Sequence, residues 1–298
     1  MYEYTIIDNN EDVAHLIDTW KNNGLLSIAM DFEGEFNLHI YGEHLCLIQL
    51  FDTQNYYLID PFQVSKESLA LLFEDPEIEK IMFACASDAS LVRKEYGLQL
   101  KNVWDVRVPA MMLGFNGNYL SLVERNLKIV AEESGNKKKN QMTNWLTRPL
   151  KSTQIQYALN DVAYLHALKE SLLEECKNEG LLTELKGKMK NVAKEKNKPK
   201  PGWMKICNWK KLNKEEKVYL KYFFIARDTL AKAWNVPAAR ILNKRTLVIM
   251  CKDVPESESQ MKEAIRTSPK TTEHLLPLMM SAKTQAHTVI RDTIDNTF

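Results

Sequence analysis

The fold of this chain is decided by the stretch Leu26-Ser27-Ile28-Ala29-Met30-Asp31-Phe32-Glu33-Gly34-Glu35, in which an apolar run passes directly into acidic residues. A short apolar run of this kind is typical of a buried strand. Similar runs follow it, and segments with helical periodicity alternate with them. The predicted strands cover residues 26–30, 45–51, 56–59 and 80–83, and the predicted helices cover residues 10–22 and 66–73. This alternation indicates a mixed α/β sheet domain.

A lysine-rich segment divides the chain. Seven lysines between residues 186 and 200 are opposed only by Glu195, and the segment ends in Pro199-Lys200-Pro201-Gly202. Because repelling charges and helix-breaking residues disfavour a folded segment, we place a basic linker at residues 187–208. It separates a domain at residues 1–186 from a domain at residues 209–298, whose long amphipathic stretch and Ser257-x-x-Gln260 capping box indicate a small all-α module.

The overall composition is ordinary for a folded, water-soluble protein, with 45% apolar and 27% charged residues. The beginning of the chain does not resemble a signal peptide, and no apolar run approaches the ~18 residues of a membrane span. We therefore expect a cytoplasmic protein that does not contact a membrane. The five cysteines contain no C-x-x-C pair, which argues against a zinc cage or a disulfide framework.

Asp31 and Glu33 are the first candidate metal ligands. Residues two apart on a strand point to the same face, with about 6 to 7 Å between their α-carbons, so one cation could bridge the two carboxylates. An Asp-x-Glu pair also arises by chance. The chain holds such a pair at Asp75-Pro76-Glu77, which we interpret as the solvated start of a helix.

Tyr157 and Asp161 are the second candidate pair. They lie in a predicted helix at residues 153–176, where a spacing of four residues places both side chains on one face. Asp161 falls at the edge of the apolar stripe of this helix, and a partly desolvated carboxylate is costly unless it is paired or binds a cation. The same spacing occurs at Tyr56 and Asp60, but there it lies on a predicted strand, which separates the side chains by ~13 Å.

Asp88 and Asp105 each follow an apolar run. Local sequence favours Asp88 as the N-cap of a helix over Asp88 as a metal ligand. Asp105 is similarly interpreted as a cap or a supporting residue.

The order of these signals resembles the ribonuclease D family of 3′-5′ exonucleases, in the subtype that uses a tyrosine. The segment at residues 145–150 and the helix with Tyr157 and Asp161 resemble its third motif, and Lys138-x-x-Gln141 resembles the preceding loop. Residues 209–293 resemble the HRDC domain, a helical nucleic-acid-binding module. The resemblance implies a ribonuclease H-like mixed-sheet exonuclease domain followed by an HRDC-like all-α domain. Phe83 stands where the family often has histidine, which puts a substrate contact in doubt.

The resemblance also implies a catalytic set. Asp31, Glu33, Asp88 and Asp161 would hold two divalent ions, Mg²⁺ or Mn²⁺, for which carboxylates are suitable ligands. Tyr157 would orient the attacking water, because Gln156 stands where the sister subtype has its histidine.

The function implied is a metal-dependent 3′-5′ exoribonuclease. It would trim RNA 3′ ends, such as those of tRNA precursors or small structured RNAs, and release nucleoside 5′-monophosphates. Lys138, Gln141 and Arg148 are predicted to bind the substrate, with a solvated loop as the alternative. Two further alternatives are a DNA-directed exonuclease of the same fold and a catalytically inactive nucleic-acid-binding homologue, although no acid of the set is missing. The sequence implies no obligate protein partner.

Overall fold

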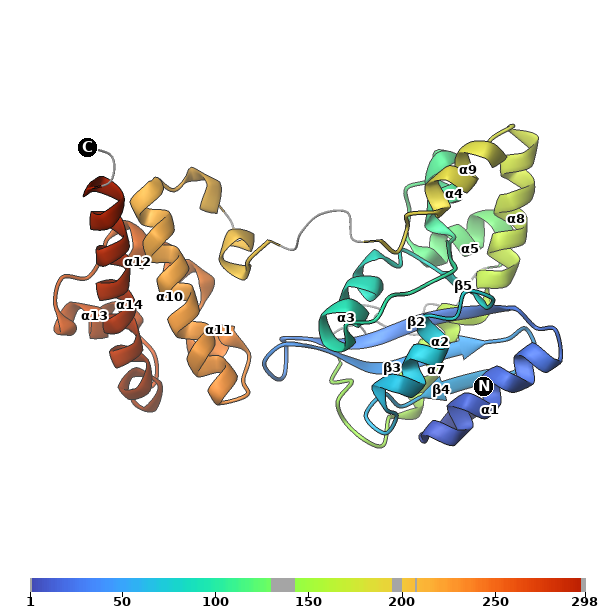
Figure 1. Ribbon diagram of the computed structural model, residues 1–298, viewed down its shortest axis with the longest axis horizontal. Helices are drawn as coiled ribbons and strands as arrows, with labels where there is room; N and C mark the ends of the chain where they lie inside the picture. The colour runs from blue at the N-terminus through green and yellow to red at the C-terminus, as the bar shows by residue number, and fades with distance from the viewer. Residues whose placement is uncertain (1, 130–142, 195–199, 207, 296–298) are drawn as a thin grey trace. The chain divides into compact units, whose positions relative to one another are not determined.

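The computed structural model describes residues 2–129, 143–194, 200–206 and 208–295 (Figure 1). The chain forms two compact units. Unit 1 comprises the described residues within 1–35 and 43–196, and unit 2 comprises those within 36–42 and 197–298. Residues 187–189 of the predicted linker continue a helix of unit 1. The domain boundaries at 1–186, 187–208 and 209–298 stay a prediction.

Unit 1 contains a mixed sheet, as predicted, and helices cover both of its faces. The described strands are β1 (Tyr4–Ile7), β2 (Ser27–Phe36), β3 (Glu43–Phe51), β4 (Tyr56–Ile59), β5 (Glu79–Met82) and β6 (Val103–Asp105). They form a six-stranded sheet in the order β1-β4-β3-β2-β5-β6. β3 and β4 pair antiparallel, whereas the pairs β1–β4, β2–β5 and β5–β6 are parallel.

The helices of unit 1 cover the two faces of this sheet. They are α1 (Asn10–Asn22), α2 (Lys66–Phe73), α3 (Ala86–Tyr96), α4 (Arg107–Met112), α5 (Tyr119–Leu127), α7 (Ser152–Ala163), α8 (Leu165–Asn178) and α9 (Leu182–Met189). Ile28 and Met30 of β2 pack in one core with residues of α1, α2 and α3. Ala29 packs in a second core with residues of α5, α7 and α8. Since side chains alternate along a strand, Asp31 and Glu33 point to the same face as Ala29.

Polar caps explain where the predicted helices begin. The side chain of Asn9 accepts a hydrogen bond from Asp12 N and starts α1, and Ser65 does the same for α2 through Ser68 N. The single helix expected at residues 153–176 is wrong, because it is divided into α7 and α8 at Tyr164. At that residue the backbone leaves the helical conformation, with φ −110° and ψ 1°.

Unit 2 is helical, as the all-α interpretation predicted. Its elements are η1 (Gly202–Lys205), η2 (Trp209–Lys211), α10 (Lys214–Ala233), α11 (Ala238–Ile241), α12 (Lys244–Lys252), α13 (Glu258–Ile265) and α14 (Pro269–Asp295). The predicted capping box is confirmed: Ser257 Oγ accepts from Gln260 N, and Gln260 Oε1 accepts from Ser257 N. Within the described residues, no helix combines the length and the apolar character that a membrane crossing requires.

Candidate active site

Asp31 and Glu33 lie inside a strand. β2 extends from Ser27 to Phe36, beyond the predicted apolar run at residues 26–30, so both acids are carried on a strand, as predicted. The extension is possible because Phe32 continues the buried face and is 7% exposed. Both carboxylates therefore have a fixed backbone and a common direction.

The Asp161 carboxylate joins them from α7. One carboxylate oxygen from each of Asp31, Glu33 and Asp161 can be chosen so that all three lie within 4.8 Å of one another. Asp31 and Asp161 are half-buried, and Glu33 is 9% exposed. The predicted convergence of residues 130 positions apart in the chain is thus present, and Asp161 is partly desolvated as expected.

The electrostatics of this cluster favour a bound cation. Burial raises the pKa of Asp31 well above its usual range, and the negative charges of Asp161 and Asp88 raise it further. Burial and the charges of the neighbouring aspartates, first that of Asp31, likewise raise the pKa of Glu33. Like charges held close together in a poorly solvated place need protons or metal ions to neutralise them. The donor set consists of carboxylate oxygens, which fits a hard divalent ion.

Asp88 lies beside this cluster but outside the group of three. It is in the first turn of α3, and the helix begins at Ala86 with Cys85 as its N-cap, so the N-cap interpretation of Asp88 is wrong. Burial raises the pKa of Asp88 to about 7, and the charge of Asp105 contributes. Because the charge of Asp88 raises the pKa of both Asp31 and Glu33, its carboxylate is within electrostatic reach of the cluster.

Asp105 supports the turn that precedes α3, the helix that carries Asp88, in keeping with its predicted supporting role. Its Oδ1 accepts a hydrogen bond from Ala84 N at 2.8 Å, and its Oδ2 accepts one from Cys85 N at 3.1 Å. Ala84 has φ 59°, in the left-handed region that a residue with a side chain rarely adopts. The two hydrogen bonds stabilise this turn immediately before α3.

Tyr157 is 7% exposed, and its hydroxyl hydrogen-bonds the Asp161 carboxylate. Its ring packs near that of Trp145, with 6.3 Å between centroids. Burial raises the pKa of Tyr157, and the charges of Asp161, Glu33 and Asp31 raise it further. Tyr157 therefore stays protonated and acts as a hydrogen-bond donor, in keeping with an orienting role.

Gln49 is a site residue that sequence analysis missed. It is fully buried in β3, and its Nε2 donates to Asp31 Oδ2 at 3.0 Å. The signal was a single amide side chain at the end of the apolar run Leu45 to Leu50. A buried amide requires hydrogen-bond partners, so such a residue indicates a polar neighbour on the adjacent strand.

Of the three predicted substrate-binding residues, Arg148 is within the described part of the chain. Lys138 and Gln141 lie outside the described residues. All five N–H donors of Arg148 have acceptors in the protein: Asp60 Oδ2 at 2.6 Å, Asp60 Oδ1 at 3.0 Å, Cys46 O at 2.6 Å, Trp145 O at 2.8 Å and Thr147 O at 3.1 Å. Its predicted substrate role stays untested, and its contacts hold the segment before α7 against β3 and β4.

Comparison with known proteins identifies the family of unit 1. The family model described as 3′-5′ exonuclease matches residues 4–177. The chain belongs to this 3′-5′ exonuclease family. The exonuclease fold implies divalent metal ions, and the carboxylate cluster of this exonuclease is consistent with them.

Ribonuclease D proteins are among its relatives, which confirms the resemblance seen in the sequence. The exonuclease is 24% identical over 262 residues to "Ribonuclease D" of Cronobacter turicensis, an alignment of 86% of this chain and 69% of the relative. It is 27% identical over 271 residues to "Ribonuclease D" of Zymomonas mobilis, with 88% and 67% covered.

Solved structures share the fold. The structure of Escherichia coli RNase D superimposes with a TM-score of 0.74 at 24% identity and covers 95% of this chain and 76% of that one. The catalytic core of RRP6 from Trypanosoma brucei gives a TM-score of 0.75 at 19% identity, with 96% and 81% covered. The similarity extends over the helical second unit as well as the sheet unit.

Proposed function

We propose that this exonuclease is a metal-dependent 3′-5′ exoribonuclease that removes nucleotides from RNA 3′ ends as nucleoside 5′-monophosphates. The observation that carries the proposal is the convergence of Asp31, Glu33 and Asp161, with one oxygen of each within 4.8 Å of the others. RNA is favoured as the substrate because the relatives are ribonuclease D proteins and the E. coli structure is that of "an exoribonuclease involved in structured RNA processing". We infer tRNA precursors or small structured RNAs as the substrate class.

Asp31, Glu33, Asp88 and Asp161 would hold two divalent ions, Mg²⁺ or Mn²⁺. When bound, such ions promote the attack of water on phosphorus and stabilise the departing 3′ oxygen. Asp31 would be the ligand shared by the two ions, as the family resemblance implies, and the charges of Asp161 and Asp88 raise its pKa. The hydrogen bond from Gln49 to Asp31 Oδ2 fixes the orientation of the Asp31 carboxylate. The carboxylate therefore loses less conformational entropy when it binds a cation.

Tyr157 would place the attacking water relative to the scissile phosphate. Its hydroxyl is held by Asp161, and its raised pKa keeps the proton on oxygen through the physiological range. Tyr157 therefore orients by donating a hydrogen bond and does not act as the base that removes a proton.

Substrate binding beyond the reacting phosphate is assigned to basic segments. Lys138 and Gln141 precede α7 in the chain, and the basic linker at residues 187–208 precedes the HRDC-like domain at residues 209–298. We expect these segments to supply affinity for phosphates that weakens steeply with added salt. A cytoplasmic location and the lack of an obligate protein partner stay predictions from the sequence.

The test is a degradation assay with the full chain. A tRNA precursor and matched RNA and DNA oligomers, labelled at the 5′ end, are incubated with Mg²⁺, Mn²⁺ or EDTA. We expect RNA to shorten stepwise from its 3′ end with either metal and to remain intact in EDTA. Internal cleavage, degradation in EDTA, or faster degradation of DNA than of RNA would each contradict the proposal.

A further inference from the structure

The junction between α7 and α8 is held by a side chain from another helix. In a continuous helix Tyr164 N–H would bond to Asn160 O, four residues earlier. Instead, Tyr164 N donates to Val162 O and also to the Tyr119 hydroxyl at 3.3 Å, and that hydroxyl donates to Asn160 O at 3.5 Å. The hydroxyl is therefore inserted into the helical hydrogen-bond ladder, which is a recognised cause of a helix break.

Tyr119 is well fixed in this position. It is the first residue of α5, it is 5% exposed, and its ring packs edge-on against Phe83 with 5.7 Å between centroids. Only a hydroxyl can serve Asn160 O as donor and Tyr164 N as acceptor at once. Phenylalanine would fill the same space and leave both backbone groups without this partner.

We propose that Tyr119 is a positioning residue for the metal site. Its hydroxyl fixes the backbone of Asn160 and Tyr164, and Asp161 lies between them. The anchor keeps the Asp161 carboxylate in place against Asp31 and Glu33 where α7 ends. This inference rests on the proposed role of Asp161 as a metal ligand.

The test compares Tyr119→Phe with Tyr57→Phe in the full chain. Tyr57 is a matched control because its hydroxyl also makes a hydrogen bond inside unit 1, to Asp52 Oδ2 at 2.9 Å, but touches none of the site carboxylates. Mn²⁺ affinity is measured by calorimetry, and exchange of the Tyr164 amide is measured in EDTA. For Tyr119→Phe we expect about three- to tenfold weaker Mn²⁺ binding, the effect of one lost hydrogen bond, and faster exchange of the Tyr164 amide.

A third variant, Asp161→Asn, separates the possible failures. If Asp161→Asn binds Mn²⁺ as the wild type does, the proposed metal site is wrong. If Asp161→Asn loses binding but Tyr119→Phe and Tyr57→Phe bind equally well, the positioning role alone is overturned. Equal exchange of the Tyr164 amide in wild type and Tyr119→Phe would also overturn it, whatever the activity.

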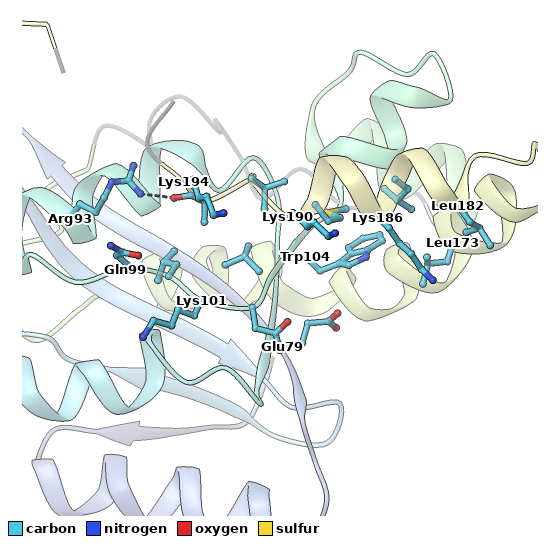
Figure 2. Close-up of a pocket in the computed structure, with 17 residues that line it drawn as sticks. Glu79, Arg93, Gln99, Lys101, Trp104, Leu173, Leu182, Lys186, Lys190 and Lys194 are labelled. Atoms are coloured by element: carbon cyan, nitrogen blue, oxygen red, sulfur yellow. Dashed lines mark hydrogen bonds between the residues drawn. The ribbon is translucent and has the colours of Figure 1, made fainter. Parts of the chain in front are cut away.

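A second, independent feature of unit 1 is a groove of about 850 Å³ beside β6 and α9 (Figure 2). Its floor is apolar and includes Val103, Trp104, Leu182 and Met189. Its rim is basic and is formed by Arg93, Lys101, Lys186, Lys190 and Lys194. The acid among its lining residues, Glu79, is already paired with Lys169 and bonded to Ser27.

We infer that this groove binds single-stranded RNA a few nucleotides upstream of the 3′ end, with phosphates on the basic rim and bases over the apolar floor. This inference rests on the proposed function. A positively charged groove with aromatic side chains is the usual combination for binding a single strand without sequence preference, and Trp104 is the aromatic residue of this groove. α3 relates the groove to the metal site, since Asp88 is in its first turn and Arg93 in its last.

The test uses Lys186→Glu/Lys190→Glu against the charge-matched control Lys66→Glu/Lys128→Glu. All four lysines are exposed, but Lys66 and Lys128 lie outside the basic linker and do not line the groove. Hydrolysis is measured on a dinucleotide and on an RNA of about twelve nucleotides, and binding of the longer RNA is measured by anisotropy in EDTA. We expect the groove variant to raise KM and Kd for the longer RNA about tenfold, to lower the salt slope of binding, and to leave the dinucleotide unchanged.

Three results would overturn the groove assignment. The first is equal RNA affinity of the two double variants, and the second is an equal loss on both substrates. The third is unchanged RNA binding with lost binding of polyglutamate, which would assign the groove to an acidic protein segment. If the wild type hydrolyses neither substrate, the proposed function fails, while the anisotropy measurement still decides the groove.

Discussion

Tyr-x-x-x-Asp occurs three times in the chain, at Tyr4 to Asp8, Tyr56 to Asp60 and Tyr157 to Asp161. The last two have the same spacing but differ in structure. On α7 the Tyr157 hydroxyl bonds the Asp161 carboxylate. At β4, Tyr56 stacks on Phe51 with 4.3 Å between ring centroids, and Asp60 pairs with Arg148 at 2.6 Å. The helix brings the two side chains together, whereas the strand leads them to separate partners.

The surroundings of the two aspartates differ as much as their geometry. Asp60 has a guanidinium bonded to both of its oxygens, so its charge is neutralised within the protein. Asp161 receives the Tyr157 hydroxyl and lies beside the carboxylates of Asp31 and Glu33. A sequence spacing therefore indicates a metal site only when secondary structure brings its side chains together with other carboxylates.

The largest difference in activity is expected between the variants that remove the charge of Asp161 and of Asp60. Asp161→Asn should lower kcat by about a thousandfold or more, because a ligand that stabilises transition-state charge is lost. Asp60→Asn should leave kcat within about twofold and instead reduce the free energy of unfolding by about 1 to 2 kcal/mol, through the weakened pair with Arg148. Steady-state kinetics and urea unfolding of both variants check the contrast, and similar kcat losses in the two would refute it.

A smaller effect is expected from the two tyrosines. Tyr157→Phe should reduce kcat by about ten- to a hundredfold with little change in the unfolding midpoint, because only the orienting hydroxyl is removed. Tyr56→Phe keeps the stacked ring and should retain full activity. Single-turnover rates at saturating Mg²⁺ measure the difference, and a Tyr157→Phe rate equal to the wild-type rate would exclude an orienting role.

Protonation of the cluster should make the stability of the metal-depleted protein depend on pH. The pKa values of Asp31, Glu33 and Asp88 are raised above their unfolded values, that of Asp88 to about 7. The folded state then binds more protons than the unfolded state between pH ~4 and ~7. The contribution of these carboxyl groups to the free energy of unfolding is therefore present at the acidic end of this window and is lost as pH rises. In EDTA we expect a loss on the order of 2 to 4 kcal/mol across this window, beyond the changes from other groups.

Mn²⁺ and the two aspartate variants sharpen this test. Mn²⁺ should remove most of the loss, because a cation replaces the protons in neutralising the cluster. Asp161→Asn should reduce the loss in EDTA, whereas Asp60→Asn should leave it unchanged. Urea unfolding at several pH values gives the comparison, and an EDTA curve that rises with pH between these limits would count against a charged, buried cluster.

Local signals explain how much of the fold could be predicted. α1 and α2 have the bounds expected from sequence because Asn9 and Ser65 cap them, and β4 matches residues 56–59. Local patterns placed Asp31 and Glu33 on a strand and Tyr157 and Asp161 on a helix, and the resemblance to the ribonuclease D family joined them into one set. Their approach to one another follows from Ala29 of β2 and Val162 of α7 packing in one core.

Contacts between distant residues explain what could not be predicted. The break between α7 and α8 at Tyr164 depends on the hydroxyl of Tyr119, which is 45 residues away in the chain. No local sequence pattern could therefore predict this break. Asp88 looked like an N-cap, but α3 begins at Ala86 because Asp105 binds the amides of Ala84 and Cys85. Local sequence could not supply either of these partners.

The smallest effect is expected at Arg148, whose guanidinium neutralises the Asp60 carboxylate. Arg148→Lys keeps the charge but loses the fork that binds Asp60 and Cys46 O together, so the free energy of unfolding should fall by about 1 kcal/mol. Because all five N–H donors already have protein acceptors, KM for RNA should change by less than about twofold. Arg125→Lys is the matched control, since Arg125 forms a comparable two-bond pair with Glu175 elsewhere in unit 1. A KM increase specific to Arg148→Lys would show that its guanidinium leaves Asp60 to bind substrate, and the region of Asp60 would then contribute to substrate binding.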